Sequence, residues 1–152
     1  TIEELNKKIE LLCATLQDTV VFITADHGHI DIQMDFFEEN YPDFAKMLVR
    51  PVSIEPRGIS FYVKDEFISV FKEKFLELFG SDYLIFSKEE VFQNNLFGPG
   101  NPHPNLTGIG DFIAPAIGTK TMFWNKTSPI FKSHHAGLTS QEMKIPLIVV
   151  EK

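Results

Sequence analysis

The sequence is poor in cysteine, with Cys13 alone among 152 residues, and this excludes a framework of internal disulfide bonds. Cys13 falls in a stretch where apolar residues recur at helical spacing, which favours a buried structural thiol. A reducing compartment suits such a thiol, so we expect a cytoplasmic protein. Long apolar runs are lacking too, because residues 20–23 and 145–150 fall far short of the roughly 20 that span a bilayer. We therefore expect no membrane segment.

Basic residues are scarce relative to acidic ones. The 14 Lys and Arg against 21 Asp and Glu give a formal net charge of -7. Binding to a nucleic-acid polymer depends on cationic side chains that neutralise phosphates, so this balance argues against such a partner. With 43% hydrophobic and 23% charged residues, the chain has ordinary globular proportions and enough length for one core.

The sequence also lacks an initiating methionine. Residue 1 is Thr1, and no basic, then apolar, then small-residue leader follows it. A secretory signal peptide would show that order. We therefore expect the chain to be part of a longer protein, with residues 1–152 forming one unit of it.

The first part of the chain predicts a surface helix followed by a buried strand. An apolar stripe at helical spacing is formed by Ile2, Leu5, Ile9, Leu12 and Leu16. Thr1 and Glu4 have the spacing of a capping box at the start of this helix. Residues 19–24 are then rich in β-branched side chains and apolar throughout, which is typical of a central strand in a parallel sheet.

The middle of the chain predicts a small α+β insertion, which we place at residues 47–95 beside the main sheet. Its elements, in order, are a hairpin with strands at 47–54 and 59–63, a helix at 65–79, a strand at 82–86 and a short helix at 88–95. The hairpin turns at residues 55–58, which contain Pro and Gly. The apolar stripe of the longer helix is Phe67, Phe71, Phe75 and Leu78. Gly80 stands where a helix terminator belongs.

Loops and a second hairpin are expected next. Residues 96–110 are dense in Gly, Pro and Asn and predict a loop with several turns. Residues 111–117 and 121–124 predict two strands of a hairpin that turns at residues 118–120.

The end of the chain predicts one helical turn and a last strand. Thr139 and Glu142 repeat the spacing of a capping box ahead of that turn. Pro146 ends it, and residues 147–150 read as an apolar strand.

The sharpest motif is Thr-Ala-Asp-His-Gly at residues 24–28, directly after the first strand. In an open α/β sheet, ligands bind at the carboxyl ends of the strands, which is where Asp26 and His27 are expected. A carboxylate oxygen beside an imidazole nitrogen suits zinc, or manganese with less preference. Gly28 is expected to permit a turn that other residues cannot adopt. The alternative is that Asp26 caps a turn and His27 is only a polar loop residue.

A second motif begins with two adjacent histidines, His134 and His135. Neighbouring side chains tend to diverge, so we expect at most one of the two to point into a given site. Glu142 could orient a histidine, as carboxylates often do around metals, or it could simply close the capping box. Taken alone, this motif is a weak signal for a ligand.

All five histidines fall in segments predicted as loops, where binding and catalytic residues are often held by a rigid scaffold. They are His27, His29, His103, His134 and His135. The two motifs adjoin apolar strands that lie about a hundred residues apart in the chain. Such an arrangement could bring both loops to one edge of one sheet.

These motifs resemble the alkaline phosphatase superfamily, close to its type I phosphodiesterase and nucleotide pyrophosphatase branch. Residues 24–28, 135–138 and 142–146 carry the likeness, and residues 110–112 add a fainter similarity. The resemblance implies an α/β fold with a mixed sheet flanked by helices. Residues 1–152 would then be the C-terminal part of the catalytic domain, with the small α+β insertion as a cap.

The resemblance also implies metal-dependent hydrolysis of a small phosphorylated substrate, a nucleotide or a phosphodiester. The family uses two divalent metals, which we expect to be Zn²⁺, with Mn²⁺ as the alternative. Asp26 and His27 would bind the metal that activates a Ser or Thr nucleophile, and His135 would bind the other. Paired cations can stabilise both the entering and the leaving oxygen of an in-line displacement.

The sequence departs from the family pattern in two ways. The nucleophile and further Asp and His ligands should precede residue 24, but the residues present there offer no setting that activates a hydroxyl. We expect the missing N-terminal part of the same protein to supply these groups, so this chain alone should be inactive. Ala136 stands where relatives often carry Gly.

Two other interpretations stay open: a non-catalytic binding or regulatory module on the same fold, and a relative such as a sulfatase or phosphoglycerate mutase. Weaker substrate-binding candidates are His29, with its neighbour Asp31, His103 and His134. Solvated loop positions explain His29 and Asp31 better, and a structural turn explains His103 better. Ser133 lies beside the two histidines but lacks the Gly-x-Ser-x-Gly setting of a nucleophile.

Overall fold

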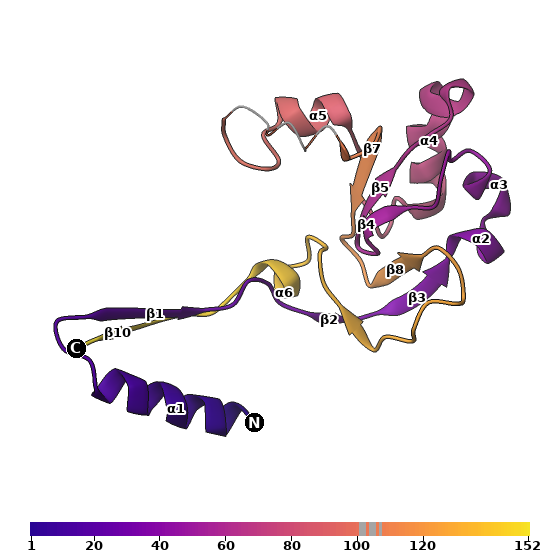
Figure 1. Cartoon of the computed structure of the whole chain (residues 1–152). Coiled ribbons are helices and arrows are strands. Elements are labelled where there is room, and N and C mark those ends of the chain that lie inside the picture. Colours follow the sequence, from indigo (N-terminus) through magenta and orange to yellow (C-terminus); the bar gives the residue numbers. More distant parts are fainter. Residues whose placement is uncertain (101–102, 104–105, 107) are drawn as a thin grey trace.

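The chain folds as a mixed α/β structure in which an arm projects from a larger body (Figure 1). The structure, a computed structural model, describes residues 1–100, 103, 106 and 108–152. The arm consists of the first helix with the first and last strands, α1 (Ile2–Ala14), β1 (Val20–Thr24) and β10 (Leu147–Glu151). Both ends of the chain therefore lie in the arm. Within the described part of the chain, no helix is long and apolar enough to cross a membrane.

Helix α1 begins at the predicted capping box. The backbone N–H of Glu4 donates to Thr1 Oγ1 at 3.3 Å, and the amino group of Thr1 donates to Glu4 Oε2 at 2.6 Å. Cys13 is buried and unpaired, as predicted. In the predicted apolar stripe, Ile2, Leu5 and Leu12 are exposed, whereas Ile9 and Leu16 are half-buried.

Strand β1 was expected to be a buried central strand with parallel neighbours. This prediction was wrong, because the strand that pairs with β1 is antiparallel to it. β1 pairs with β10 in antiparallel register, from Val20 opposite Glu151 to Thr24 opposite Leu147. Within the described residues these two strands form a ribbon of their own, and Phe22 remains 66% exposed. The apolar run predicted a strand correctly, but it carries no information on which segment covers it.

The main sheet of the body has four antiparallel strands in the order β4-β5-β7-β6. These are β4 (Ser53–Glu55), β5 (Gly58–Phe61), β7 (Phe112–Pro115) and β6 (Phe86–Ser87). The hairpin predicted around residues 55–58 is confirmed as β4 and β5, with a shorter first strand. Strand β7 lies between β5 and β6, so the sheet takes one strand from beyond residue 95.

Two smaller strand pairs connect this sheet to the arm. β3 (Gln33–Phe36) runs parallel to β8 (Lys120–Phe123), and β2 (Ile30–Asp31) pairs antiparallel with β9 (Ser133–His134). Three short helices, α2 (Phe37–Asn40), α3 (Pro42–Ala45) and α6 (Ser140–Met143), complete this region. The sequence patterns did not predict the elements between residues 30 and 45.

The hairpin expected between residues 111 and 124 does not form. Its two strands exist as β7 and β8, but each pairs with a different partner. The backbone N–H groups of Ile117 and Gly118 both donate to the carbonyl of Asp82, at 2.7 and 3.0 Å. These bonds hold the connecting turn against another segment, so the chain passes from one sheet to the other instead of folding back.

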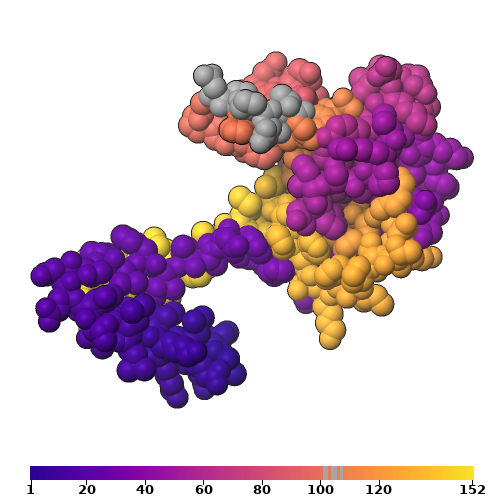
Figure 2. Space-filling model, in the orientation of Figure 1, coloured from indigo at the N-terminus to yellow at the C-terminus, as the bar shows by residue number. Residues whose placement is uncertain are grey.

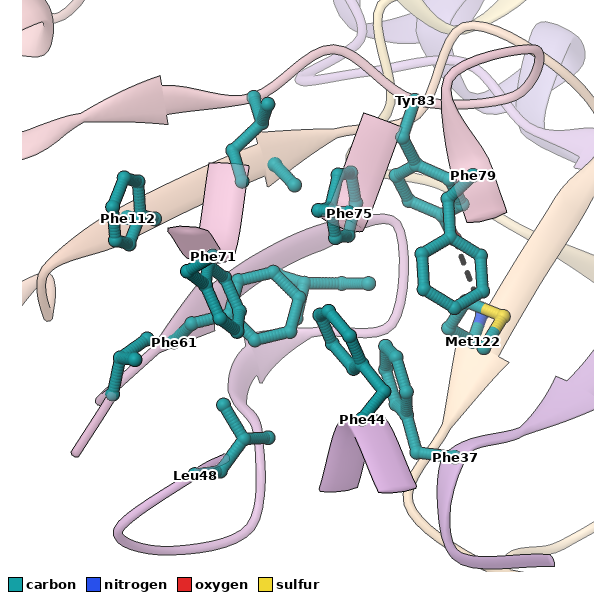
Figure 3. Close-up of a cluster of buried hydrophobic side chains, with 14 of the residues drawn as sticks. Phe37, Phe44, Leu48, Phe61, Phe71, Phe75, Phe79, Tyr83, Phe112 and Met122 are labelled. Atoms are coloured by element: carbon teal, nitrogen blue, oxygen red, sulfur yellow. Dashed lines mark hydrogen bonds between the residues drawn. The ribbon is translucent and has the colours of Figure 1, made fainter. Parts of the chain in front are cut away.

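The core is a cluster of aromatic side chains between the main sheet and helix α4 (Ile68–Phe79) (Figure 3). Helix α4 follows a short 3₁₀ turn at Asp65–Phe67 and ends at Gly80, as predicted. Its buried residues are Phe71, Phe75 and Phe79, whereas Leu78 is 44% exposed. The prediction of Leu78 as the last residue of the stripe was therefore wrong. The helix buries Phe79 instead, because residues spaced by four, such as 71, 75 and 79, lie on the same face.

Two further predictions need smaller corrections. The strand expected at 82–86 is reduced to β6 and a single bridge between Tyr83 and Ala116. The short helix expected after it is confirmed as α5 (Lys88–Gln93), with a capping box from Ser87 to Glu90. The loop predicted at 96–110 includes positions 101, 102, 104, 105 and 107, which lie outside the described residues.

Candidate metal centre

The loop that carries Asp26 and His27 is fixed to the segment around α6. Thr24 Oγ1 donates to the carbonyl of Pro146 at 2.8 Å, and the N–H of Gly28 donates to the carbonyl of Glu142 at 2.8 Å. A Cβ atom at position 28 would overlap the carbonyl oxygen of Gln141. Glycine is therefore needed here for the close approach of two backbones, and not for a turn with positive φ as the sequence suggested.

Asp26 and His27 present one oxygen and one nitrogen on the same side. The N–H of His27 donates to Asp26 Oδ1 at 3.0 Å, while His27 Nε2 lies 3.5 Å from Asp26 Oδ2. His27 Nδ1 lies 3.0 Å from the carbonyl oxygen of Gly28. A carbonyl only accepts hydrogen bonds, so Nδ1 carries a proton and the neutral ring keeps its lone pair on Nε2. The pair thus offers a free carboxylate oxygen and a free imidazole nitrogen.

The second motif brings His135 directly against the first. The rings of His27 and His135 stack with centroids 3.8 Å apart and planes 8° from parallel. The ring of His29 lies 5.2 Å from that of His27 and 5.0 Å from that of His135. One ligand atom from each of these three histidines falls within 4.8 Å of the others. Asp26, His27 and His135 also line one hollow of about 340 Å³.

His135 is kept in the neutral form that a metal ligand needs. Burial lowers the pKa of His135 below its ordinary value, and the nearby imidazoles of His27, His134 and His29 lower it further. The negative charge of Glu55 acts in the opposite direction and raises the pKa of His135. A neutral imidazole has a lone pair to donate near neutral pH, whereas an imidazolium does not.

His134 lies beside His135, and the expectation that the two side chains diverge was wrong. Their rings are 5.3 Å apart and 15° from parallel. His134 Nδ1 lies 3.1 Å from the carbonyl of His135, which leaves Nε2 of the neutral ring as the free donor atom. Together with Glu55, these two histidines form a second group whose ligand atoms all lie within 4.8 Å. His134 itself belongs to strand β9 and not to a loop.

The loop after His135 is held by a buried ion pair that the sequence did not predict. Arg57 donates from Nε to Glu142 Oε1 at 2.6 Å and from Nη2 to Glu142 Oε2 at 2.8 Å. The same carboxylate accepts the N–H of Gly137 at 2.8 Å and the hydroxyl of Thr139 at 2.6 Å. Arg57 lies in the turn between β4 and β5, where a single arginine gives no signal in the sequence.

Glu142 therefore closes the predicted capping box, and it orients the histidine loop without touching a histidine in any described contact. Burial alone would raise its pKa. The hydrogen bonds from Arg57, Thr139 and the Gly137 N–H outweigh burial and lower the pKa of Glu142 to about 2. The carboxylate is thus ionised at neutral pH and paired with a guanidinium.

Ala136, between His135 and Gly137, has a backbone φ of +81°. This left-handed conformation favours glycine, which agrees with the family pattern at this position. The departure from the pattern therefore leaves the turn in place but adds backbone strain.

The remaining candidates take up separate positions. Asp31 is exposed and lies opposite Ser133 in the β2–β9 pair. His103 is exposed and belongs to neither of the two potential ligand groups found among the described residues. Its neighbours Pro102 and Pro104, on which the prediction of a rigid loop rested, lie outside the described residues.

Imidazole nitrogens and a carboxylate oxygen within reach of one another are the donor set that zinc binds in proteins, and manganese accepts it as well. Asp26 Oδ2 and His27 Nε2 offer such an oxygen and nitrogen 3.5 Å apart, and His135 lines the same hollow. Asp26 itself belongs to neither of the two ligand groups found among the described residues. His29 adds a third imidazole to the group although its side chain is exposed. The residues present therefore fit a divalent metal.

Solved structures of phosphate and phosphonate hydrolases have the same fold. Human ectonucleotide pyrophosphatase/phosphodiesterase 5 aligns over 97% of this chain and 38% of its own, with a TM-score of 0.65 and 15% identity. Its murine counterpart, also solved as an inactive variant in complex with AMP, aligns over 96% of this chain and 39% of its own, with a TM-score of 0.63 and 15% identity. Phosphonoacetate hydrolase from Sinorhizobium meliloti, solved with phosphonoformate, covers 86% of this chain and 36% of its own, with a TM-score of 0.60 and 16% identity.

No family model and no curated protein matches the sequence. The chain spans less than two-fifths of the length of each of these three structures. At such low identity, the agreement shows the architecture and not the chemistry. The chain therefore has the mixed α/β fold of these solved structures.

Proposed function

We propose that this chain forms part of a metal-dependent hydrolase of phosphate esters, in which Asp26, His27 and His135 bind two divalent metals. The observation that carries the proposal is the contact between His27 and His135, whose rings stack 3.8 Å apart although they come from opposite ends of the chain. Hydrolases with this fold act on phosphodiesters, pyrophosphates and phosphonates according to their names. Zn²⁺ is the metal we expect, and Mn²⁺ is the alternative.

The residues of this chain have defined tasks in that site. Asp26 and His27 share one side of the hollow and would hold one metal through Oδ2 and Nε2, which already lie 3.5 Å apart. His135 would hold the other metal. Divalent metals supply Lewis acidity that stabilises the charge developing on phosphate oxygens. The His135 loop is kept in position by the Gly137 N–H bond to Glu142 and, through it, by Arg57.

We further propose that the nucleophile and the remaining metal ligands come from another segment of the same protein. The arm supports this, because it exposes apolar side chains that a folded protein normally covers. On β1 and β10 these are Val20, Phe22, Leu147, Ile148 and Val149, which are 48% to 67% exposed. Figure 2 shows the arm standing away from the body, with room for further structure beside it. The structural neighbours are also more than twice as long as the part that aligns.

The test is hydrolysis by the intact protein that contains this chain. With excess Zn²⁺, it should bind two metal ions per chain and hydrolyse bis(4-nitrophenyl) phosphate. Asp26→Asn and His135→Gln should each lower kcat/KM by more than a hundredfold and reduce the metal content. His103→Gln, a histidine outside the cluster, is the matched control and should retain both properties.

An intact protein that stays metal-free in excess Zn²⁺ and hydrolyses no phosphate ester would overturn the proposal. That result would leave a non-catalytic module on the same fold. Full activity of the 152-residue chain alone would show instead that the nucleophile lies within it.

A further inference from the structure

An apolar pocket of about 310 Å³ lies next to the histidine cluster. Its walls come from strands β4 to β7, from the segment after α5 and from the loop that follows His135. The side chains that matter for the argument are Ile54, Phe86, Phe97, Ile113 and Leu138. In Figure 2 the region of α5 overhangs the C-terminal segment, drawn in yellow, that carries this loop.

The pocket and the hollow of the candidate metal centre share a wall. Ala136 and Leu138 line both, and Ala136 directly follows the proposed ligand His135. A phosphate held by the histidine cluster would therefore lie close to the entrance of the apolar pocket. A substrate with a charged phosphate and an apolar group needs a polar and an apolar region that adjoin each other, and these two hollows do.

The pocket has one charged residue in its lining, Glu55. The carboxylate of Glu55 lies near His134 and His135, so it marks the boundary with the cluster. A carboxylate at this place opposes a second phosphate or another anion inside the pocket. The remaining walls favour an uncharged group without strong hydrogen-bonding needs.

Several residues that line the pocket have a strained backbone or an exposed apolar side chain, and both are unfavourable in the folded chain. Ile54 has φ +72° and Ala136 has φ +81°, so two of the four non-glycine residues with positive φ in the described part of the chain line this one pocket. A β-branched residue in that region is a genuine outlier, and such strain gathers at ligand sites. Ile54, Phe97 and Leu138 are also 59%, 55% and 44% exposed, although they are large apolar side chains. Binding an apolar group would cover them.

We propose that this pocket binds the apolar, uncharged organic group of the phosphate ester whose phosphate lies at the histidine cluster. This inference rests on the proposed function and specifies its substrate class as esters of aryl or bulky alkyl alcohols. The volume equals that of about ten water molecules, which is enough for a fused aromatic ring pair. The shared wall at Ala136 and Leu138 favours this occupant over an unrelated partner, because it aligns the pocket with the reacting phosphate.

The experiment compares two diesters of 4-nitrophenyl phosphate on the intact protein with Zn²⁺. The leaving group, 4-nitrophenolate, is the same in both, and the other ester group is methyl in one and 1-naphthyl in the other. The naphthyl ester should have at least tenfold higher kcat/KM. Phe97→Ala should reduce that ratio about fivefold. Leu76→Ala removes a side chain with 44% exposure on helix α4, and the ratio should stay unchanged.

Binding of 1-naphthol, measured by saturation-transfer NMR on the intact protein, gives a readout that needs no hydrolysis. Its signal should weaken in Phe97→Ala and persist in Leu76→Ala. Equal kcat/KM for both esters, with hydrolysis intact, would overturn the pocket assignment and leave the proposed function standing. Failure to hydrolyse either ester would instead overturn the proposed function, and with it the assignment of this substrate class.

Discussion

The guanidinium of Arg57 and the carboxylate of Glu142 form a two-bond ion pair in which the two side chains are 0% and 1% exposed. Arg57 lies in the β4–β5 turn and Glu142 in α6, so the pair joins the main sheet to the helix that follows the histidine loop. The same guanidinium donates to the carbonyl of Gly118 at 2.9 Å and to Thr121 Oγ1 at 3.1 Å. This pair thus fixes three segments around the proposed ligand His135.

Arg57→Met should destabilise the fold by about 3–5 kcal/mol, because it leaves the buried carboxylate of Glu142 without its counter-charge. Urea unfolding followed by circular dichroism measures the change. The control is Lys46→Met, which breaks the exposed pair with Asp43 at 2.8 Å and should cost less than about 1 kcal/mol. Equal losses in the two variants would show that the buried pair has no special role.

The stability of the chain should fall in acid partly through Glu142. Its pKa is about 2 in the folded chain against an ordinary 4.5, so the folded state binds the proton less readily than the unfolded state. The stabilisation is therefore present above pH 4.5 and is lost as the pH falls towards 2. The shift corresponds to roughly 3 kcal/mol. Glu142→Gln should be less stable at pH 7, and its unfolding free energy should decline less steeply between pH 5 and pH 2.

That comparison is made by urea titration at a series of pH values. If the unfolding free energies of the two proteins declined in parallel between pH 5 and pH 2, Glu142 would not be the source of the acid sensitivity. Protonation of Glu142 would also weaken the hydrogen bond that its carboxylate accepts from the N–H of Gly137, so the histidine loop should lose order over the same pH range.

Gly28→Ala should disrupt the contact between the Asp26–His27 loop and α6. The added Cβ would overlap the carbonyl of Gln141, which belongs to the backbone and cannot turn aside. We expect a loss of about 2–3 kcal/mol and a tenfold or greater loss of metal affinity. Gly108→Ala is the control, since a Cβ there meets no atom of the described residues within 4 Å, and it should change stability by less than about 1 kcal/mol. A fully stable Gly28→Ala with unchanged metal affinity would contradict the tight packing seen here.

The sequence predicted the local elements better than their partners. Capping boxes and apolar stripes depend on neighbours three or four residues away, so α1, α4, α5 and α6 were found. The partners of β7 and β8 were predicted wrongly because they depend on distant contacts, such as those of Ile117 and Gly118 with Asp82. The parallel setting expected for β1 was wrong for the same reason.

Sequence reasoning reached the candidate site through two short motifs. Asp26 and His27 stood out because an Asp-His-Gly run after an apolar strand is an uncommon pattern. His135 was a weak signal alone, and the family resemblance singled it out. The approach of His29 and Glu55 to these residues could not be predicted, since each lies in a segment whose direction is fixed by tertiary packing. Arg57 carries no local signal at all, because only the fold reveals that its charge is buried.

Helix α4 allows a direct test of the stripe that the sequence misjudged. Phe79 is fully buried, and its ring centroid lies 5.5 Å from that of Phe44 (Figure 3). The ring centroid of Tyr41 lies 4.7 Å away. Phe79→Ala should therefore cost about 3–5 kcal/mol. Leu78→Ala, at the adjacent position with 44% exposure, should cost less than about 1 kcal/mol. Denaturant unfolding measures the loss of stability in both variants. A larger loss in Leu78→Ala than in Phe79→Ala would support the stripe predicted from the sequence.

Ala136→Gly should stabilise the chain, which is unusual for a change to glycine. Ala136 has φ +81°, a region that costs an L-residue about 1–2 kcal/mol and costs glycine almost nothing. Glycine also gains entropy in the unfolded state, so the net gain should be near 1 kcal/mol. The control is Ala114→Gly in strand β7, a fully buried residue in extended backbone, where the same change should lose roughly 1 kcal/mol. Ala136 directly follows His135, so the metal affinity of the variant is informative as well. A gain in stability with unchanged metal affinity would show that the strained backbone is not needed to position the imidazole of His135. A gain in stability with weaker metal binding would show that the strained turn holds that imidazole in place.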